Sequence, residues 1–378
     1  MKTKGILIIL LFISCTLEAQ IEAITPKYHL PSTVSETSGL LFYNGKLITH
    51  NDSGDAANLY EIDTISGIIN RTIQINNATN IDWEAIGQDD KYLYIGDFGN
   101  NNGNRRDLRI YRILKSEYNN ATTVSSEVIS FSYEDQTDFS AIPYQHDFDA
   151  EAFVIYNEQI IIFSKNWASN TVKAYSIPKT LGTHTAQLID TYDSQGLITD
   201  ATHNSEDNSF MLCGYTRQGG LFLLYLHDIA ANMPFHGVIE RTDITSSIGL
   251  GSQIEGITNI EGNKYFLSRE YRSVSVSGVL LELQQHLFRF DNGSYNALSV
   301  LPQRLNLLDL YPNPTSGSLH ISGAEIVKLV ITDSKGRRLI TKKNPSIPIQ
   351  LDALNAGIYY VQITTRDQTK FTKKIMKY

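Results

Sequence analysis

Short apolar stretches, many of which end in polar residues, fill most of the chain between residues 35 and 292, and turns rich in Gly, Asn and Asp separate them. Short apolar runs that are bounded by turn residues predict β-strands. The stretches fall into five segments with one shared pattern: a polar or acidic residue, a small residue, and then up to four strands. The expected strands are 35–43, 46–52, 58–64 and 68–75; 82–88, 92–99, 107–114 and 127–133; 149–156, 159–166, 172–178 and 186–192; 199–205, 209–216, 220–229 and 237–244; 254–260, 264–271 and 286–292.

Repeats of about 45 to 65 residues with four strands each predict a β-propeller, in which every module forms one blade. The direct count is five blades, and the loose stretch 272–300 leaves a sixth open. The fifth module lacks a clear fourth strand. We expect residues 21–30 to supply that strand and to close the ring by pairing with the last module.

Each module has a small residue early in its first strand: Gly39, Ala85, Ala152, Ala201 and Gly256. First strands crowd around the axis of a propeller, where a small side chain lets neighbouring backbones approach. The preceding residues would therefore form a ring at one mouth of the central channel. They are Ser38, Glu84, Glu151, Asp200 and Glu255, and Asp82 and Asp149 lie two positions before the small residue on the same face.

Further polar residues end the second strands near this ring: Asn51, Asp52, Asp97, Lys165, Asn166, Arg269 and Glu270. Carboxylates held close together raise one another's pKa unless a cation compensates them. Hard oxygen ligands from several strands suit Ca²⁺, so Glu84, Glu151, Asp200 and Glu255 are candidate metal ligands. Two other interpretations stay open: Lys165 and Arg269 neutralise the ring, or two of its carboxyls act as a catalytic acid and base.

The last seventy or so residues have a different character. Leu319, Ile321, Leu329 and Ile331 alternate with polar residues, and Asp333-Ser334-Lys335-Gly336 supplies a turn between two such runs, which predicts a small Ig-like antiparallel β-sandwich. The segment closely resembles the C-terminal sorting domain of the type IX secretion system of Bacteroidetes. The matching motifs are Tyr311-Pro312-Asn313-Pro314-Thr315-Ser316-Gly317, the turn 333–337, 354–361 (LNAGIYYV) and the terminal Lys373-Lys374-Ile375.

The N-terminus supports export. Lys2 and Lys4 precede an unbroken apolar run from Ile6 to Ile13, and Leu17-Glu18-Ala19 offers a cleavage site, which is the pattern of a signal peptide. The run is too short to span a bilayer, and no later stretch is apolar enough to do so. We therefore expect a signal peptide at 1–19, a propeller domain at 20–304 and a sorting domain at 305–378. The sorting resemblance implies type IX machinery as a partner and a secreted or surface-attached product.

Charge narrows the class of ligand. The chain has a formal net charge of −8, the signal peptide contributes +1, and the segment from Leu305 onward holds eleven basic and five acidic residues, which leaves about −15 on the central domain. Nucleic-acid binding depends on clustered Lys and Arg, so no nucleic-acid partner is expected. One cysteine, Cys213, lies beyond the signal peptide, which excludes an intramolecular disulfide in the mature chain.

The central repeats resemble secreted propellers of the NHL/SdiA-regulated and esterase-like phytase type. The similarity lies in Ser38-Gly39-Leu40, 82–86 (DWEAI), 94–101 (YIGDFGNN), 149–152 (DAEA) and 254–257 (IEGI). It implies a propeller with a polar channel mouth able to bind calcium, and it fixes no activity.

We expect a binding or scaffold protein that holds Ca²⁺ at the channel mouth and meets a glycan, protein or small-molecule ligand. The alternative is a metal-dependent phosphoesterase or esterase, in which Glu84 or Glu151 positions water and Lys165, Arg269 or Arg105 steadies negative charge. Binding is favoured because the sequence yields no nucleophile–base constellation. Trp83 and Trp167 lie beside channel-facing positions, where packing between modules is favoured over stacking on a sugar.

Overall fold

The computed structural model describes residues 23–229, 233–276, 279–293, 309–322, 326–333, 337–366 and 370–378. The chain forms two compact units that divide between residues 294 and 295. The predicted signal peptide at 1–19 and the predicted domain boundary at 304/305 both lie outside the described residues. The fold is all-β, as predicted, and the described helices are short: α1 (Lys115–Asn120), α2 (Thr245–Ile248), η1 (Ser32–Val34) and η2 (Pro234–His236).

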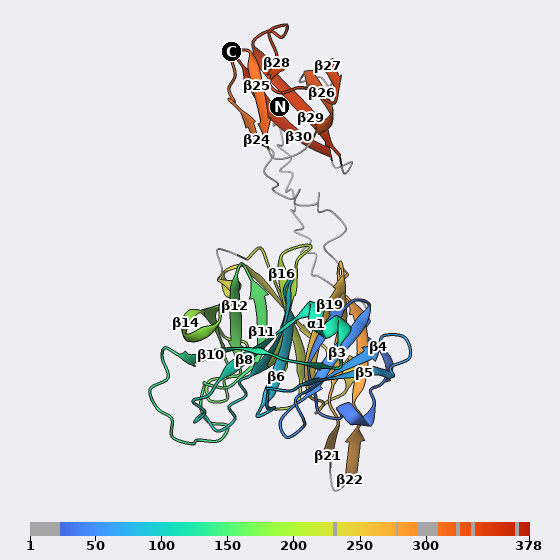
Figure 1. The fold of residues 1–378 in the computed structure, drawn as a ribbon, viewed down its shortest axis with the longest axis vertical. Coiled ribbons are helices and arrows are strands. Elements are labelled where there is room, and N and C mark those ends of the chain that lie inside the picture. Colours follow the sequence, from blue (N-terminus) through green and yellow to red (C-terminus); the bar gives the residue numbers. More distant parts are fainter. Residues whose placement is uncertain are drawn as a thin grey trace, which may run out of the picture. The chain divides into compact units, whose positions relative to one another are not determined.

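Strands of the first unit pair in chain order, which is what the predicted modules require (Figure 1). Most of these strands are buried on both faces: Leu59 and Ile62 lie on opposite faces of β4 and belong to two different core clusters, so each sheet packs against neighbours on both sides. The first four modules are β2 (Thr37–Tyr43), β3 (Lys46–Asn51), β4 (Asn58–Asp63) and β5 (Ile69–Ile75); β6 (Trp83–Gln88), β7 (Tyr92–Asp97), β8 (Arg109–Leu114) and β10 (Glu127–Tyr133); β11 (Ala150–Tyr156), β12 (Gln159–Ser164), β13 (Val172–Pro178) and β14 (Gly182–Tyr192); β15 (Leu197–Asn204), β16 (Ser209–Tyr215), β17 (Leu221–His227) and β18 (Val238–Asp243).

The fifth module combines the two ends of the unit. β19 (Ile254–Glu261), β20 (Lys264–Arg269) and β23 (His286–Asp291) form a sheet whose fourth strand is β1 (Thr25–His29). β1 runs antiparallel to β23, with Thr25 opposite Arg289 and His29 opposite His286. The N-terminal strand therefore completes the last module, as the sequence pattern predicts.

The five first strands contact one another in a closed cycle, β2 with β6, β6 with β11, β11 with β15, β15 with β19 and β19 with β2. Small residues permit this approach. A Cβ on Gly39 would lie 2.9 Å from the backbone nitrogen of Ile86, and one on Gly256 would lie 2.8 Å from Cβ of Leu40. Ala85 and Ala152 are completely buried in the same zone.

Three features of the first unit are absent from the predicted pattern. The short strand β9 (Thr123–Val124) follows α1 and adds to β5, and β10 pairs with β14 in parallel, which joins the second and third modules into one eight-stranded sheet. The stretch that left a sixth blade open contains a two-stranded hairpin, β21 (Arg272–Val276) and β22 (Val279–Leu283). Figure 1 shows this hairpin projecting from the body of the unit.

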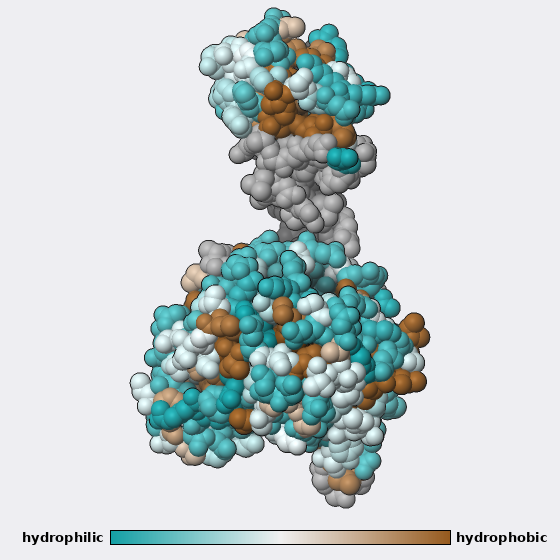
Figure 2. Space-filling view, viewed as in Figure 1, coloured by the Kyte–Doolittle hydropathy of each residue, from teal (hydrophilic) through white to brown (hydrophobic). Residues whose placement is uncertain are grey.

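The surface of the first unit suits contact with water. Figure 2 shows that hydrophilic residues cover most of its visible face and that apolar residues occur there in small groups. Scattered apolar side chains of this kind are normal on a folded protein and mark no single patch.

The C-terminal unit consists of two antiparallel sheets that share one core. The predicted inward residues Leu319, Ile321, Leu329 and Ile331 are all buried and belong to that core. Asp333 and Arg337 flank the predicted turn, whose residues 334–336 lie outside the described part, and the Arg337 N–H donates to Asp333 Oδ1 at 2.9 Å. The strands are β24 (Asp309–Tyr311), β25 (Ser318–Ser322) and β28 (Ile349–Gln350) in one sheet, and β27 (Arg338–Lys343), β26 (Ile326–Asp333), β29 (Gly357–Thr365) and β30 (Lys370–Lys377) in the other.

Candidate functional site

A cavity of about 660 Å³ opens where the first strands of the modules begin, and we call it the acidic cavity. Glu84, Glu151 and Glu255 reach it from β6, β11 and β19, while Asp52 and Glu270 reach it from the ends of the second strands β3 and β20. Other lining residues include Ser38, Lys165, Tyr144, Trp167, Tyr215, Arg217 and Arg272.

A local irregularity aims the three first-strand glutamates into the acidic cavity. The pairing register of β6, β11 and β19 with their second strands skips Glu84, Glu151 and Glu255, respectively. A residue skipped in this way forms a β-bulge, which leaves it out of the ladder and redirects its side chain. The equivalent skipped residues in β2 and β15 are Gly39 and Thr199.

The bulges show that the predicted alignment of the five modules is wrong by one residue in β2 and in β15. The skipped residue is Gly39 and not Ser38 in β2, and Thr199 and not Asp200 in β15. Asp200 lies one position after the bulge of β15 and pairs with Cys213. Its carboxylate accepts the N–H groups of Ala201 at 2.8 Å and Ile257 at 2.7 Å, so it ties β15 to β19 and does not line the acidic cavity. The expected ring of four carboxylates therefore contains three from the first strands, and burial raises the pKa of Asp200 well above its usual range.

Ser38 does line the acidic cavity, and its hydroxyl donates to the Glu84 backbone oxygen at 3.1 Å and to Glu84 Oε2 at 3.3 Å.

Lys165 is the buried cation of the acidic cavity. Its ammonium forms an ion pair with Glu151 Oε1 and lies 5.0 Å from the ring centre of Trp167 and 5.1 Å from that of Tyr215. Burial disfavours the ammonium, but the charges of Glu151, Tyr215, Glu255 and Asp149 together outweigh it and hold the pKa of Lys165 well above its usual value. Glu151 Oε2 accepts no hydrogen bond from any described residue.

Arg269 lies elsewhere. Its guanidinium donates to the backbone oxygens of Gln284 at 2.7 Å and Ile248 at 3.1 Å, so it holds the loops around β20. Of the two cations expected to neutralise the ring, only Lys165 is among the residues that line the acidic cavity. One buried ammonium against five lining carboxyls leaves an excess of acid.

The carboxyls of Asp52, Asp82 and Glu84 converge. One oxygen each of Asp52, Asp82 and Glu84 lies within 4.8 Å of the other two. Burial, followed by the charges of Asp52 and Asp149, raises the pKa of Asp82 to about 7, and burial with the Asp52 and Glu151 charges raises the pKa of Glu84 well above its usual range. Gly99 makes room for the group, because a Cβ at this position would clash with the Asp82 carboxylate.

Asp97 and Asp149 support the site from outside the cavity lining. Asp97 Oδ1 forms an ion pair with Arg105 Nη2 at 3.0 Å. Arg105, which was predicted as a contact for an anionic ligand, is therefore already paired with a carboxylate of the protein. Asp149 accepts the backbone N–H of Asn100 at 2.6 Å and the indole N–H of Trp167 at 2.7 Å. Asp149 thus orients Trp167, whereas Trp83 is completely buried and packs against Tyr111.

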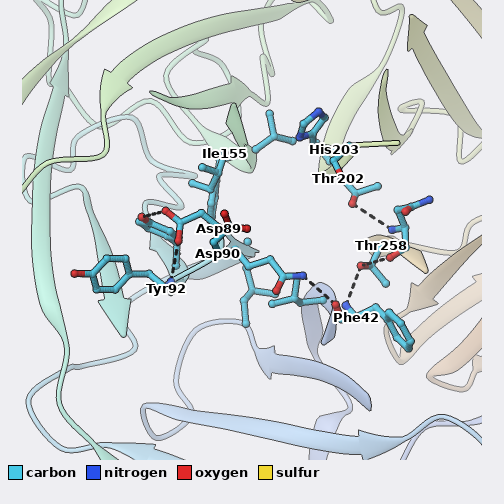
Figure 3. Close-up of a pocket in the computed structure, with 18 of the residues that line it drawn as sticks. Phe42, Asp89, Asp90, Tyr92, Ile155, Thr202, His203 and Thr258 are labelled. Carbon is cyan, nitrogen blue, oxygen red and sulfur yellow. Dashed lines mark hydrogen bonds between the residues drawn. The ribbon is translucent and has the colours of Figure 1, made fainter. Parts of the chain in front are cut away.

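A second cavity of about 840 Å³ is lined by the other ends of the same five first strands (Figure 3). Its polar groups hold the strands together: the Phe42 N–H donates to Thr258 Oγ1 at 2.9 Å, and the Asn259 N–H donates to Thr202 Oγ1 at 3.2 Å. Asp89 accepts the N–H of Tyr92 at 2.8 Å and pairs with Lys179 at 3.1 Å. Most acids here are matched, unlike those of the acidic cavity.

Asp52 and Glu270 were predicted to lie near the ring, because they directly follow the second strands β3 and β20, but they were not among the predicted metal ligands; both line the acidic cavity. Tyr215 also lines the cavity and was not predicted. Burial, followed by the charges of Glu255 and Asp52, raises the pKa of Glu270 to about 9, and burial raises the pKa of Glu255 to about 7. Tyr215 ends β16, and no pattern in the sequence marks it as a lining residue.

Comparisons with known proteins place the C-terminal unit. No described helix has the length and apolar character needed to cross a membrane. A search of curated proteins found no match to the sequence.

Among solved structures, the chain is 12% identical to an extracellular domain attributed to a hybrid two-component system from B. thetaiotaomicron, with a TM-score of 0.33 over 96% of this chain and 60% of that one. The chain therefore spans less than two thirds of the length of that structure.

Two further structures match at similar levels. The hydrazine synthase of Kuenenia stuttgartiensis is 9% identical, with a TM-score of 0.35 over 92% of this chain and 97% of that chain. An exo-beta-1,3-galactanase from Phanerochaete chrysosporium is 8% identical, with a TM-score of 0.42 over 94% of this chain and 100% of that one. Scores this low carry no argument about the site.

A comparison with protein-family models identifies the C-terminal part of the chain. Residues 309–378 match the family model of the secretion system C-terminal sorting domain, which confirms the resemblance to type IX sorting domains in the last part of the chain. This domain indicates export to the cell surface or the outside and implies interaction with the type IX secretion machinery. The protein therefore carries a type IX sorting domain at its C-terminus.

Proposed function

We propose that the exported protein is a binding module whose first unit is a five-bladed β-propeller, followed by an Ig-like sorting sandwich. The closed cycle of contacts among β2, β6, β11, β15 and β19 supports the propeller. The two cavities then correspond to the two mouths of its central channel.

The acidic mouth is proposed to hold a divalent cation, with Ca²⁺ as the best fit. The observation that supports this proposal most directly is the convergence of Asp52, Asp82 and Glu84, which each place one oxygen within 4.8 Å of the other two. Ca²⁺ takes six to eight oxygen ligands in flexible geometry, which carboxylates from separate strands can supply. The unpartnered Glu151 Oε2 offers a further hard oxygen on the same cavity wall.

The raised pKa values of Asp82 and Glu84 agree with this proposal. Carboxyls that repel one another in a buried place take up protons when no cation is available. A bound Ca²⁺ would replace those protons and let the carboxylates ionise. When bound, the ion would fix the ends of β3 and β6 relative to each other and present a positive charge to ligands entering the mouth.

Calorimetric titration of the purified protein with CaCl₂ tests the proposal. We expect one site that is weakened at least ten-fold by Glu84→Gln, because a neutral amide replaces a charged ligand. Asp90→Asn is the matched control, since Asp90 is an exposed acid that lines the other cavity. Full calcium affinity in Glu84→Gln would overturn this assignment of the site.

No observation favours the metal-dependent phosphoesterase or esterase over binding. The purified protein can be tested for this activity in the same buffers. Calcium-dependent hydrolysis of a phosphoester or ester that is abolished in Glu84→Gln, with the fold intact, would show that hydrolysis and not binding is the function.

A further inference from the structure

The rim of the acidic cavity carries basic side chains, whereas most of the charged side chains deeper in the cavity are acidic. Arg217 and Arg272 line the cavity, and neither forms an ion pair with a described carboxylate. Arg217 donates from Nε to Asn170 Oδ1 at 3.1 Å, and Arg272 donates from Nη1 to the Gly251 backbone oxygen at 3.2 Å. Each guanidinium therefore keeps further N–H donors for a ligand.

An aromatic surface lines the same cavity, and Arg217 lies 5.9 Å from the ring centre of Trp167. The Tyr144 side chain is 52% exposed, and its ring lies edge-to-face with Trp167 at 4.8 Å between centres. Tyr144 has a left-handed backbone (φ 56°), held by its N–H bond to the Asn101 oxygen at 3.0 Å. A non-glycine residue adopts this conformation at a cost, which the surrounding loop must offset. The loop thus presents a large apolar ring to solvent in a fixed position.

We propose that the acidic cavity binds uronate-bearing oligosaccharides: a pyranose ring packs on Tyr144, sugar carboxylates meet Arg217 and Arg272, and a Ca²⁺ ion bridges the ligand to the cavity. This inference rests on the calcium site proposed above. Flat sugar faces pack on aromatic rings, whose polar ends can stay in water. Arginine recognises carboxylates through paired N–H donors.

The cation is essential to this mode of binding. Asp52, Glu84, Glu151, Glu255 and Glu270 line the cavity, and Lys165 alone is buried among them as a cation. A uronate entering without calcium would meet five acidic side chains, and Arg217 and Arg272 would offset only part of their charge, because Lys165 is paired with Glu151. Bound calcium reverses the sign of the local field, as metal ions do in other sites. Binding of the anionic sugar should therefore require calcium, whereas binding of a neutral sugar should depend on calcium much less.

The test measures binding of tetragalacturonic acid and its fully methyl-esterified form to the purified protein, each with calcium at a fixed free concentration and with EDTA. We expect the acid to bind only with calcium, and at least about ten-fold more tightly than the ester, since one charge-assisted contact is worth roughly a factor of ten. Arg217→Ala with Arg272→Ala should remove that preference while leaving direct calcium binding unchanged. Tyr144→Ala should weaken the acid about five-fold.

Tyr360→Ala, an exposed tyrosine of the sorting unit, is the matched control and should bind the acid normally. Equal binding of acid and ester, or no binding of either while calcium still titrates into the protein, would overturn the uronate inference and leave the calcium proposal standing. Failure of calcium itself to bind would instead overturn the proposed function. Calcium-independent binding of the acid would contradict the bridging role of the ion.

Discussion

Single residues in the first strands decide how closely the modules can approach. Gly39 has a positive φ of 68°, and a Cβ there would lie 2.9 Å from the Ile86 nitrogen and 3.0 Å from the Ala85 Cα. Both neighbours are backbone atoms of β6, which cannot move aside as a flexible side chain does. Two independent costs therefore meet at this position: backbone strain and a clash.

Gly39→Ala should lower the free energy of unfolding by about 3 kcal/mol or more, as measured by urea denaturation. Gly45→Ala separates the two costs, because Gly45 also has a positive φ, 75°, but open space around its Cβ position. The control should lose only about 1 kcal/mol, from strain alone. Equal losses in the two variants would show that β2 and β6 are not packed as closely as described.

Glu270 should make the protein less stable as the pH rises. Its pKa is about 9 in the folded protein, mainly through burial, against about 4.3 for an unfolded glutamate. The folded state therefore holds the proton more tightly, so the stabilisation is complete below about pH 4 and is lost as the pH rises toward 9.

Urea denaturation at pH 5, 6.5 and 8 in EDTA measures this loss. Glu270→Gln, which cannot ionise, should reduce the slope of stability against pH by at most about 1.4 kcal/mol per pH unit. An unchanged slope would mean that Glu270 titrates near its ordinary pKa.

At the scale of elements, the repeated pattern of short apolar runs predicted the strands of all five modules, and the missing fourth strand of the last module predicted the pairing of β1 with β23. The bulges were not predictable, because an extra residue in a strand leaves the composition unchanged and appears only in the pairing register. That is why Asp200 was expected beside Glu84 and is instead bound to the Ala201 and Ile257 amides. The role of Arg269 was equally hidden, since its partners are backbone oxygens of distant loops.

β1 contributes to the last module mainly through backbone pairing with β23 and only slightly through buried side chains. Four of its five side chains are exposed, and Tyr28 reaches across to donate to the Asp63 backbone oxygen at 3.1 Å. Deletion of residues 23–29 should uncover the edge of β23, and an open edge invites pairing with another chain. We expect concentration-dependent oligomers in size-exclusion chromatography with light scattering.

Tyr28→Ala is the control for this deletion, because it removes the side chain and leaves the strand in place. It should keep the oligomeric state of the unchanged protein, with a modest loss of stability. A deletion variant that forms no larger species than the unchanged protein, or a Tyr28→Ala variant that does, would contradict the role assigned to β1.

At the scale of the whole molecule, the sorting domain and the proposed binding site belong to different parts of the chain. Residues 309–378 match the sorting family, and the acidic cavity lies entirely within the first unit. The sorting motifs were predictable because they are contiguous in sequence. The cavity was predictable only in outline, because it depends on how five distant segments meet.

The position of a bound calcium ion tests the central claim most directly. Crystals of the protein grown with CaCl₂, measured at a wavelength where calcium scatters anomalously, should show a peak about 2.4 Å from carboxylate oxygens of Asp52, Asp82 and Glu84. An anomalous map at saturating calcium with no peak among these three carboxylates, or with calcium bound only elsewhere, would contradict the account.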